Sequence, residues 1–253
     1  MGTLRLRGKS LQGTGTSGNY SRFLFNNNEL VSCKGAIRTL IDYENYKNVE
    51  TNKASFFGLF YNCRVLTTVP ELPSTDLASC CYEEMFYNCT ALTTAPQLPA
   101  MKLSMSCYNS MFSNCSSLTN APELPATDLA ESCYSNMFEG CTSLTSAPEL
   151  PATNLAEFCY ARMFIECKSL TTAPELPAPI LSPRCYVQMF HGCSKLENIT
   201  MLATDISAEN CLSSWTWIVS STGTFTKAKE MVSLPEGSDG IPKKWTVKNY
   251  GEE

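Results

Sequence analysis

Apolar residues recur along this chain in a fixed order that repeats every 26 residues. A typical unit contains Cys-Tyr-x-x-Met-Phe-x-x-Cys, then Ser-Leu-Thr, then Ala-Pro-Glu-Leu-Pro. Its central apolar pair falls at Leu59–Phe60, Met85–Phe86, Met111–Phe112, Met137–Phe138, Met163–Phe164 and Met189–Phe190. Because no insertion disturbs this register, the pattern predicts a protein built from stacked structural repeats.

The first half of each unit predicts a helix. In residues 127–152 the apolar positions occur at offsets 0, 1, 4, 5, 8, 9 and 12, which we interpret as one face of a helix. Thr127 or Asp128 can cap its start, and Glu131 in the first turn suits the helix dipole. The residue before the second Cys is Asn or Gly in five of the six units, and both tolerate the left-handed conformation in which helices end. Glu166 is the exception, so we expect a less favourable helix end there.

The second half of each unit predicts a short strand. Thr145 and Ser146 suit an extended segment, and Pro148 and Pro151 limit its length because proline cannot donate to a sheet. A lone helix and strand of this size cannot bury their apolar faces, whereas stacked units share a continuous core. The predicted fold class is therefore an α/β solenoid, a right-handed array of strand-helix units with parallel strands on its concave face and β-rich caps at its ends.

The chain divides into three predicted parts. Residues 1–54 form a β-rich N-terminal cap, in which RFLFNNNELVSC (22–33) indicates a hairpin around an Asn-rich turn. Residues 55–198 form the solenoid, and residues 199–253 form a C-terminal cap of helix and strands.

The C-terminal cap has its own predicted elements. ISAENCLSSWTWIV (206–219) predicts a last helix, while GTFTKAK (223–229) and KKWTVKN (243–249) predict two closing strands. We interpret Trp215 and Trp217 as packing residues of this cap, with a ligand platform as the alternative.

Composition and charge argue against several classes of protein. A chain of 253 residues with 43% hydrophobic residues can fold around a core, so we do not expect disorder. A net charge of −5 argues against a nucleic-acid partner. No apolar run reaches the length of about 18 residues that spans a bilayer, so we expect no membrane insertion. The start, MGTLRLRGKSLQGTGTSG, lacks the apolar core of a signal peptide.

Twelve of the fourteen cysteines belong to two columns with the 26-residue spacing. The first column is Cys81, Cys107, Cys133, Cys159, Cys185 and Cys211, and the second is Cys63, Cys89, Cys115, Cys141, Cys167 and Cys193. We expect most of them to be reduced, buried, small apolar residues, because helix dimensions and helix spacing disfavour disulfides. A bridge within the second column stays open as an alternative, as does the redox state of Cys33 and Cys80.

No group of residues indicates catalysis, a cofactor or a metal. His191 is the only histidine, no Ser-His-Asp or Cys-His arrangement can be argued around it, and it occupies a column that we interpret as exposed. The cysteines lack C-x-x-C pairs, which disfavours zinc. We therefore predict no catalytic residue, no cofactor, no metal ligand and no enzymatic activity.

Two columns on the predicted concave face form a candidate ligand face. The first contains small polar residues, namely Thr94, Asn120, Ser146 and Thr172. The second is acidic and contains Glu123, Glu149 and Glu175, with Glu71 and Gln97 in the same register. Such groups can hydrogen-bond a sugar or peptide and can attract a cation or a basic partner. A solvated acidic stripe is the alternative. The neighbouring threonine column, Thr67, Thr93, Thr119, Thr145 and Thr171, either stabilises the sheet or presents hydroxyl groups to a ligand.

The stretch MFEGCTSLTSAPELPATNLAEFCYARMF (137–164) resembles the leucine-rich repeats of the BspA-like family. Here Met-Phe stands where that family has Ala-Phe, and Ala-Pro-Glu-Leu-Pro stands where it has Ile-x-Ile-Pro. Similar units occur in surface proteins of Bacteroides and other gut Bacteroidetes and in their phages. The resemblance implies a leucine-rich-repeat fold, and adhesion or protein binding at a cell surface.

The predicted function is a non-enzymatic binding or adhesion module that recognises a protein or glycan through its repeat-built surface. The alternative is a structural spacer or stalk of a larger surface or phage tail protein. The resemblance places the protein at a cell surface, in secreted form or on a virion.

Overall fold

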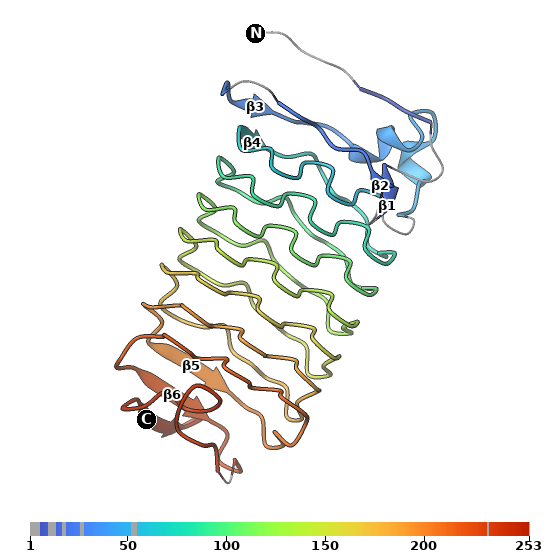
Figure 1. Cartoon of the computed structure of the whole chain (residues 1–253). Helices are drawn as coiled ribbons and strands as arrows, with labels where there is room; N and C mark the ends of the chain where they lie inside the picture. The colour runs from blue at the N-terminus through green and yellow to red at the C-terminus, as the bar shows by residue number, and fades with distance from the viewer. Residues whose placement is uncertain are drawn as a thin grey trace.

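The chain forms a stack of coils, one for each 26-residue unit (Figure 1). The computed structural model describes residues 6–9, 14–16, 19–25, 28–51, 55–231 and 233–252. Equivalent positions of successive coils lie side by side, as the parallel bridges from Asp76 to Lys102 and from Lys102 to Asp128 show.

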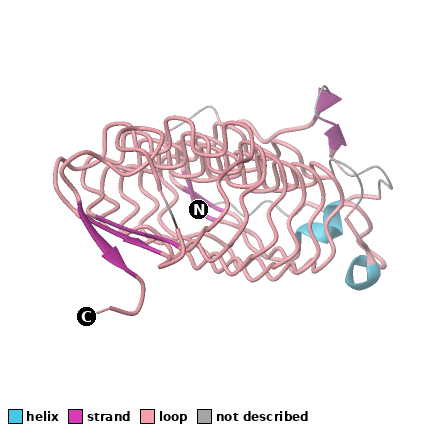
Figure 2. Cartoon of the chain, turned by 90° about the horizontal axis from the view of Figure 1, so that it is seen from below, coloured by secondary structure: helices cyan, strands magenta, loops and turns pink. Residues whose placement is uncertain are grey.

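Regular secondary structure occupies little of the described chain (Figure 2). The elements are β1 (Gly15–Thr16), β2 (Asn19–Tyr20), β3 (Val31–Ser32), η1 (Ile37–Leu40), η2 (Tyr46–Asn48), β4 (Leu66–Thr68), β5 (Asn198–Met201), β6 (Thr224–Lys227) and β7 (Thr246–Asn249), where η marks a 3₁₀ helix. Strand β1 pairs antiparallel with β2, and β3 pairs in parallel with β4. Strands β5, β6 and β7 form a parallel sheet in that order.

The predicted α/β solenoid of strand-helix units is wrong, because the described residues contain no α-helix. The segment 132–141, predicted as helical, is a succession of tight turns. Its odd-numbered residues donate their N–H groups three residues back, as Cys133 does to the carbonyl of Ala130 (3.2 Å). Its even-numbered residues donate to the next coil, as Tyr134 does to Cys159 (3.0 Å). Half of the backbone N–H groups of this segment therefore form hydrogen bonds between coils, whereas the N–H groups of an α-helix bond to carbonyls of the same helix.

The spacing of the apolar residues explains why turns form instead of a helix. One set recurs at strict steps of four, at Leu129, Cys133, Met137 and Cys141. An α-helix has 3.6 residues per turn, so the last of four such residues would lie about 120° away from the first. The turns have a four-residue period, with positive φ at Ser132, Asn136 and Gly140 (55°, 55° and 70°). A four-residue period keeps the whole set on one face, and Cys133, Met137 and Cys141 are fully buried.

The left-handed conformation predicted for the Asn and Gly residues before the second cysteine is confirmed, and Glu166, the expected exception, adopts it as well. The φ angles are 63° at Asn62, 57° at Asn88, 61° at Asn114, 70° at Gly140, 59° at Glu166 and 77° at Gly192. These residues end a run of turns rather than a helix. A Cβ atom at Gly140 would lie 2.5 Å from Oδ1 of Asn114, so a larger residue there would displace that side chain.

The strand predicted in each unit is reduced to isolated contacts in most coils. Thr94, Asn120 and Ser146 pair through single parallel bridges, and only β4 and β5 are longer strands at equivalent places. Prolines follow these positions in the middle coils and limit the pairing, whereas β5 lies in a stretch without proline. The leucine-rich-repeat prediction is therefore wrong for both halves of the unit.

Aromatic side chains form two ladders through the core. Tyr82, Tyr108, Tyr134, Tyr160 and Tyr186 form the first, and Phe60, Phe86, Phe112, Phe138, Phe164 and Phe190 form the second. Neighbouring ring centroids are 5.5 to 6.1 Å apart, and all of these rings are buried. Both cysteine columns are buried as predicted, and each of their thiols is free of a disulfide. Aromatic stacking adds to the burial of apolar area in holding adjacent coils together.

The C-terminal end differs in part from its prediction. The two closing strands are confirmed, since β6 and β7 extend β5 as a parallel sheet. The helix predicted over 206–219 is wrong, because these residues continue the turns of the coils. Trp215 is buried and donates its Nε1–H to the carbonyl of Gly240 (2.9 Å), as a packing residue would, whereas Trp217 is exposed.

The hairpin predicted over residues 22–33 does not form between the described residues. Asn26 and Asn27 of its Asn-rich turn lie outside the described residues. The arm that follows them, β3, pairs in parallel with β4 instead of folding back on residues 22–25. The proposed boundaries between the three parts of the chain stay predictions.

Candidate ligand face

The seven residues of the candidate ligand face are all exposed. They lie in the extended part of each coil, where the chain leaves the buried leucines of the core, such as Leu118 and Leu144. Parallel bridges bring Thr94, Asn120 and Ser146 together in adjacent coils. Thr172 pairs with Asn198 of β5 instead, so it belongs to a neighbouring group. The first column is therefore divided.

Three residues of the adjacent threonine column, Thr67, Thr119 and Thr145, use their hydroxyl groups within the protein. Thr119 donates its Oγ1–H to the carbonyl of Thr93 (3.4 Å), and Thr145 donates to the carbonyl of Thr119 (3.3 Å). The N–H groups of Thr119 and Thr145 donate to the same two carbonyls (3.4 and 3.2 Å). These contacts favour the structural interpretation, in which the hydroxyl groups support the stacking of the coils.

The acidic column alternates with buried leucines along each coil. Glu123 and Glu149 are exposed and precede the buried Leu124 and Leu150. Among the described residues, neither carboxylate has a cation beside it. Glu175 accepts a hydrogen bond from the hydroxyl of Tyr250 (3.1 Å), and this contact raises the pKa of that hydroxyl. Glu123 and Glu149 are thus available to a partner.

A hollow opens in this face between two coils. It has a volume of about 280 Å³ and is lined by Thr145, Ser146, Ala147, Thr171, Thr172, Ala173 and Pro174. The N–H groups of Thr119 and Thr145 each reach the preceding coil, but within the described chain that of Thr171 has no backbone acceptor. The ladder of coil-to-coil contacts is therefore broken here. The letters Thr-Thr-Ala-Pro at 171–174 also occur at 93–96, so the sequence gives no signal for this gap.

The buried thiols contribute to structure rather than to reactivity. Cys141 donates its S–H to the carbonyl of Phe112 (3.2 Å), which also accepts the N–H of Cys115 (3.0 Å). Burial raises the pKa of the Cys115 thiol to about 12, so little of the reactive thiolate forms near neutral pH.

Two further predictions concern His191 and metal sites. His191 is half-buried rather than exposed, with its ring 5.7 Å from that of Trp217 and its Nδ1 atom without a hydrogen-bond partner. Across the described ranges, no three His, Cys, Asp or Glu side chains gather as a metal site would require. That part of the chain also contains no helix long and apolar enough to span a membrane.

The chain matches no family model, no curated protein and no solved structure. The resemblance of its repeat motif to the BspA-like family stays a prediction.

Proposed function

We propose that this protein is a non-enzymatic binding or adhesion module that recognises a protein or glycan through the candidate ligand face. The observation that supports this most directly is the alignment of exposed polar groups across adjacent coils, with Asn120 and Ser146 joined by a bridge. Glu123 and Glu149 follow on the same two coils. Hydroxyl, amide and carboxylate groups in register can make several hydrogen bonds to an extended ligand. The resemblance to BspA-like repeats supports a location at a bacterial surface or on a phage particle.

Binding of the whole chain to a glycan array and to surface-protein extracts tests this proposal. The double variant E123Q/E149Q removes two charges from the ligand face with little change in shape. We expect it to weaken binding by at least about tenfold, because hot-spot contacts are worth more than about 1.4 kcal/mol. The matched control E131Q/E230Q neutralises two exposed carboxylates elsewhere and should bind like the natural chain. Equal loss in both variants, or no loss in either, would place recognition outside this face.

The alternative function, a spacer or stalk, is favoured by the regularity of the stack. The phenylalanine ladder passes from Phe60 to Phe190 without a gap. A spacer needs length and stiffness but no ligand, so its role should survive both double variants. Removal of one internal 26-residue unit would then shorten the distance that the stack bridges between two domains fused to its ends.

A further inference from the structure

The last coil of the stack carries backbone donors that would serve a further coil. In each coil every second N–H group donates to a carbonyl of the next one, as Arg184 does to Glu209 (2.9 Å) and Tyr186 does to Cys211 (3.0 Å). The equivalent donors one unit later are Asn210, Leu212, Ser214 and Thr216. No further 26-residue coil follows them in the described chain.

The loop 235–241 satisfies only half of these donors. The N–H of Ser214 donates to Oδ1 of Asp239 (2.6 Å), and the N–H of Thr216 donates to the carbonyl of Ser238 (3.2 Å). The N–H groups of Asn210 and Leu212 have no acceptor among the described residues. Leu212 is only 4% exposed, and a backbone donor that is removed from water without a partner costs free energy.

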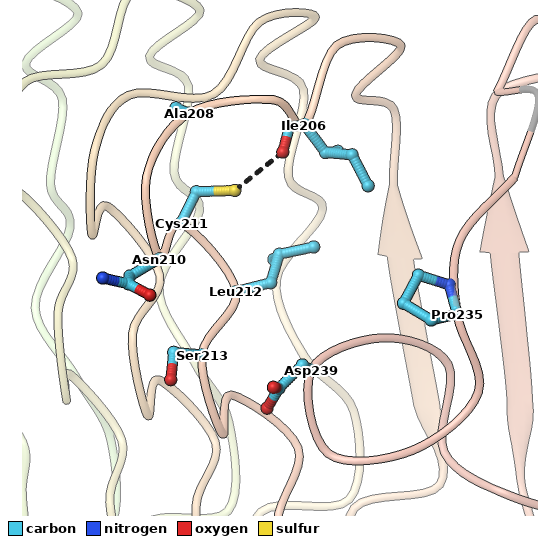
Figure 3. Close-up of a pocket in the computed structure, with 8 residues that line it drawn as sticks. All are labelled: Ile206, Ala208, Asn210, Cys211, Leu212, Ser213, Pro235 and Asp239. Atoms are coloured by element: carbon cyan, nitrogen blue, oxygen red, sulfur yellow. Dashed lines mark hydrogen bonds between the residues drawn. The ribbon is translucent and has the colours of Figure 1, made fainter.

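A hollow lies beside these two unpaired donors. Its volume is about 200 Å³, and it is lined by Ile206, Ala208, Asn210, Cys211, Leu212, Ser213, Pro235 and Asp239. Figure 3 shows the side chain of Leu212 extending toward Pro235 across this space, with the loop of Asp239 below them. Leu212 stands one unit after Tyr186, the last ring of the tyrosine ladder, so the hollow continues the direction in which the rings stack. A cavity of about 150 Å³ suffices for a benzene ring in another protein.

The thiol in this hollow does not explain it. Cys211 donates its S–H to the carbonyl of Ile206 (3.2 Å; Figure 3), and burial raises the pKa of the thiol. The groups left for recognition are two N–H donors, two residues apart, and an apolar wall. A peptide in the turn conformation of a coil matches this set, because alternate carbonyls of that conformation accept from such donors, as those of Glu209 and Cys211 do from Arg184 and Tyr186.

We propose that the C-terminal end of the stack is a docking site for a peptide segment of another protein that adopts the turn conformation of a coil. Two carbonyls of this peptide, two residues apart, accept hydrogen bonds from the N–H groups of Asn210 and Leu212. An aromatic or aliphatic side chain of the peptide fills the hollow between Leu212 and Pro235. The site continues the interface that already joins every pair of coils. A folded second copy is a poor occupant, because the equivalent carbonyls of its inner coils are already used, as that of Glu157 is by Ser132.

A peptide copied from an internal coil is a suitable probe. Ac-LAESCYS-NH2 reproduces residues 129–135, in which the carbonyls of Glu131 and Cys133 accept from Ser106 and Tyr108 (3.0 and 3.1 Å). We expect its addition, under reducing conditions, to shift the amide NMR signals of Asn210 and Leu212. Hydrogen exchange of these two amides should slow by at least about tenfold at saturation, because they gain acceptors. A control peptide with alanine in place of tyrosine should bind at least about tenfold more weakly.

Two variants of the protein separate docking from general effects. Ala208→Arg places a long charged side chain in the wall of the hollow and should abolish the shifts. Pro235→Ser removes an apolar contact from the other wall of the hollow, where Pro235 is exposed, and should weaken peptide binding several-fold. This second variant keeps the test valid if Ala208→Arg disturbs the fold. The proposal is overturned if both amides are already protected in the isolated chain, or if neither responds to the peptide. Equal binding of the two peptides would also overturn the proposal. So would amide NMR shifts that depend on protein concentration and not on peptide, because they would indicate that a second copy of the chain occupies the site.

Discussion

The Phe-x-x-Cys motif has a specific role at the scale of single residues. The Phe carbonyls of the first five units, from Phe60 to Phe164, each accept two hydrogen bonds, one from a cysteine N–H in the same coil and one from a thiol of the next coil. This shared acceptor explains why a cysteine recurs at that place, since a small apolar side chain with an S–H donor satisfies both the packing and the second lone pair.

Replacement of Cys141 tests the thiol–carbonyl contact. We expect Cys141→Ala to lower the free energy of unfolding by about 1–2 kcal/mol, through the lost hydrogen bond and a small cavity. Cys141→Ser keeps a donor of similar size and should lie closer to the natural chain. Urea denaturation measures both, and a Cys141→Ala protein as stable as the natural one would show that the contact contributes nothing.

At the scale of elements, the sequence predicts which residues are buried better than it predicts the backbone that buries them. The columns of Cys, Tyr, Met and Phe are buried as expected, and Asn62 and Gly192 have the expected left-handed conformation. Over three steps, however, a spacing of four residues looks like one face of a helix. In the sequence, only the strictness of the four-residue spacing distinguishes these turns from a helix. In the structure, the turns differ from a helix in the positive φ angles of ordinary residues such as Phe158 and Arg162. Such residues avoid this conformation by about 1–2 kcal/mol, so local preference argues against it and contacts between coils must compensate.

The ligand face shows the same division between predictable and unpredictable features. Exposure of Glu123 and Glu149 follows from their alternation with buried leucines, which the sequence displays. The separation of Thr172 from Ser146 depends on its pairing with Asn198 in β5, a contact that no local pattern contains.

The phenylalanine ladder allows a quantitative test of how coils hold together. Phe138 stacks on Phe112 and Phe164, with centroid distances of 5.8 and 5.7 Å. We expect Phe138→Ala to cost about 3–5 kcal/mol, because it opens a cavity between coils, and Phe138→Leu to cost roughly 1.5 kcal/mol or less. Tyr87→Ala is the control: this half-buried ring stacks on Tyr61 at 4.7 Å outside the core and should cost about 1 kcal/mol. Urea denaturation measures the free energy of unfolding of each variant. Equal decreases for Phe138→Ala and Tyr87→Ala would contradict the view that the buried phenylalanine ladder stabilises the stack more than the outer tyrosine pair does.

At the scale of the whole molecule, the coils hold many weak acids out of water. The thiols of both cysteine columns and the hydroxyl groups of the tyrosine ladder are buried, and desolvation is the first cause of a raised pKa in each. The ordinary pKa of 9.0 rises to about 11 at Cys63 and to about 12 at Cys185. All of these groups shift in the same direction, so their effects on stability add.

The stack should therefore lose stability in alkali. An acid whose pKa is higher in the folded protein retains its proton there while the unfolded chain has already lost it. Unfolding then releases protons, and the free energy of unfolding falls as pH rises. For Cys63 this fall begins near 9.0, its value in the unfolded chain, and ends near the folded value of about 11. Each buried acid contributes up to about 1.4 kcal/mol per pH unit between its unfolded and folded pKa values.

We expect the midpoint of urea denaturation to change little with pH up to about pH 8, as far as these acids determine it, and to decline steeply above about pH 9. The midpoint of the double variant C115A/C141A should fall less steeply with pH, because two of the buried acids are removed. If the midpoint of the natural chain is the same at about pH 10 as at neutral pH, the thiols and tyrosine hydroxyl groups are not buried in the folded protein.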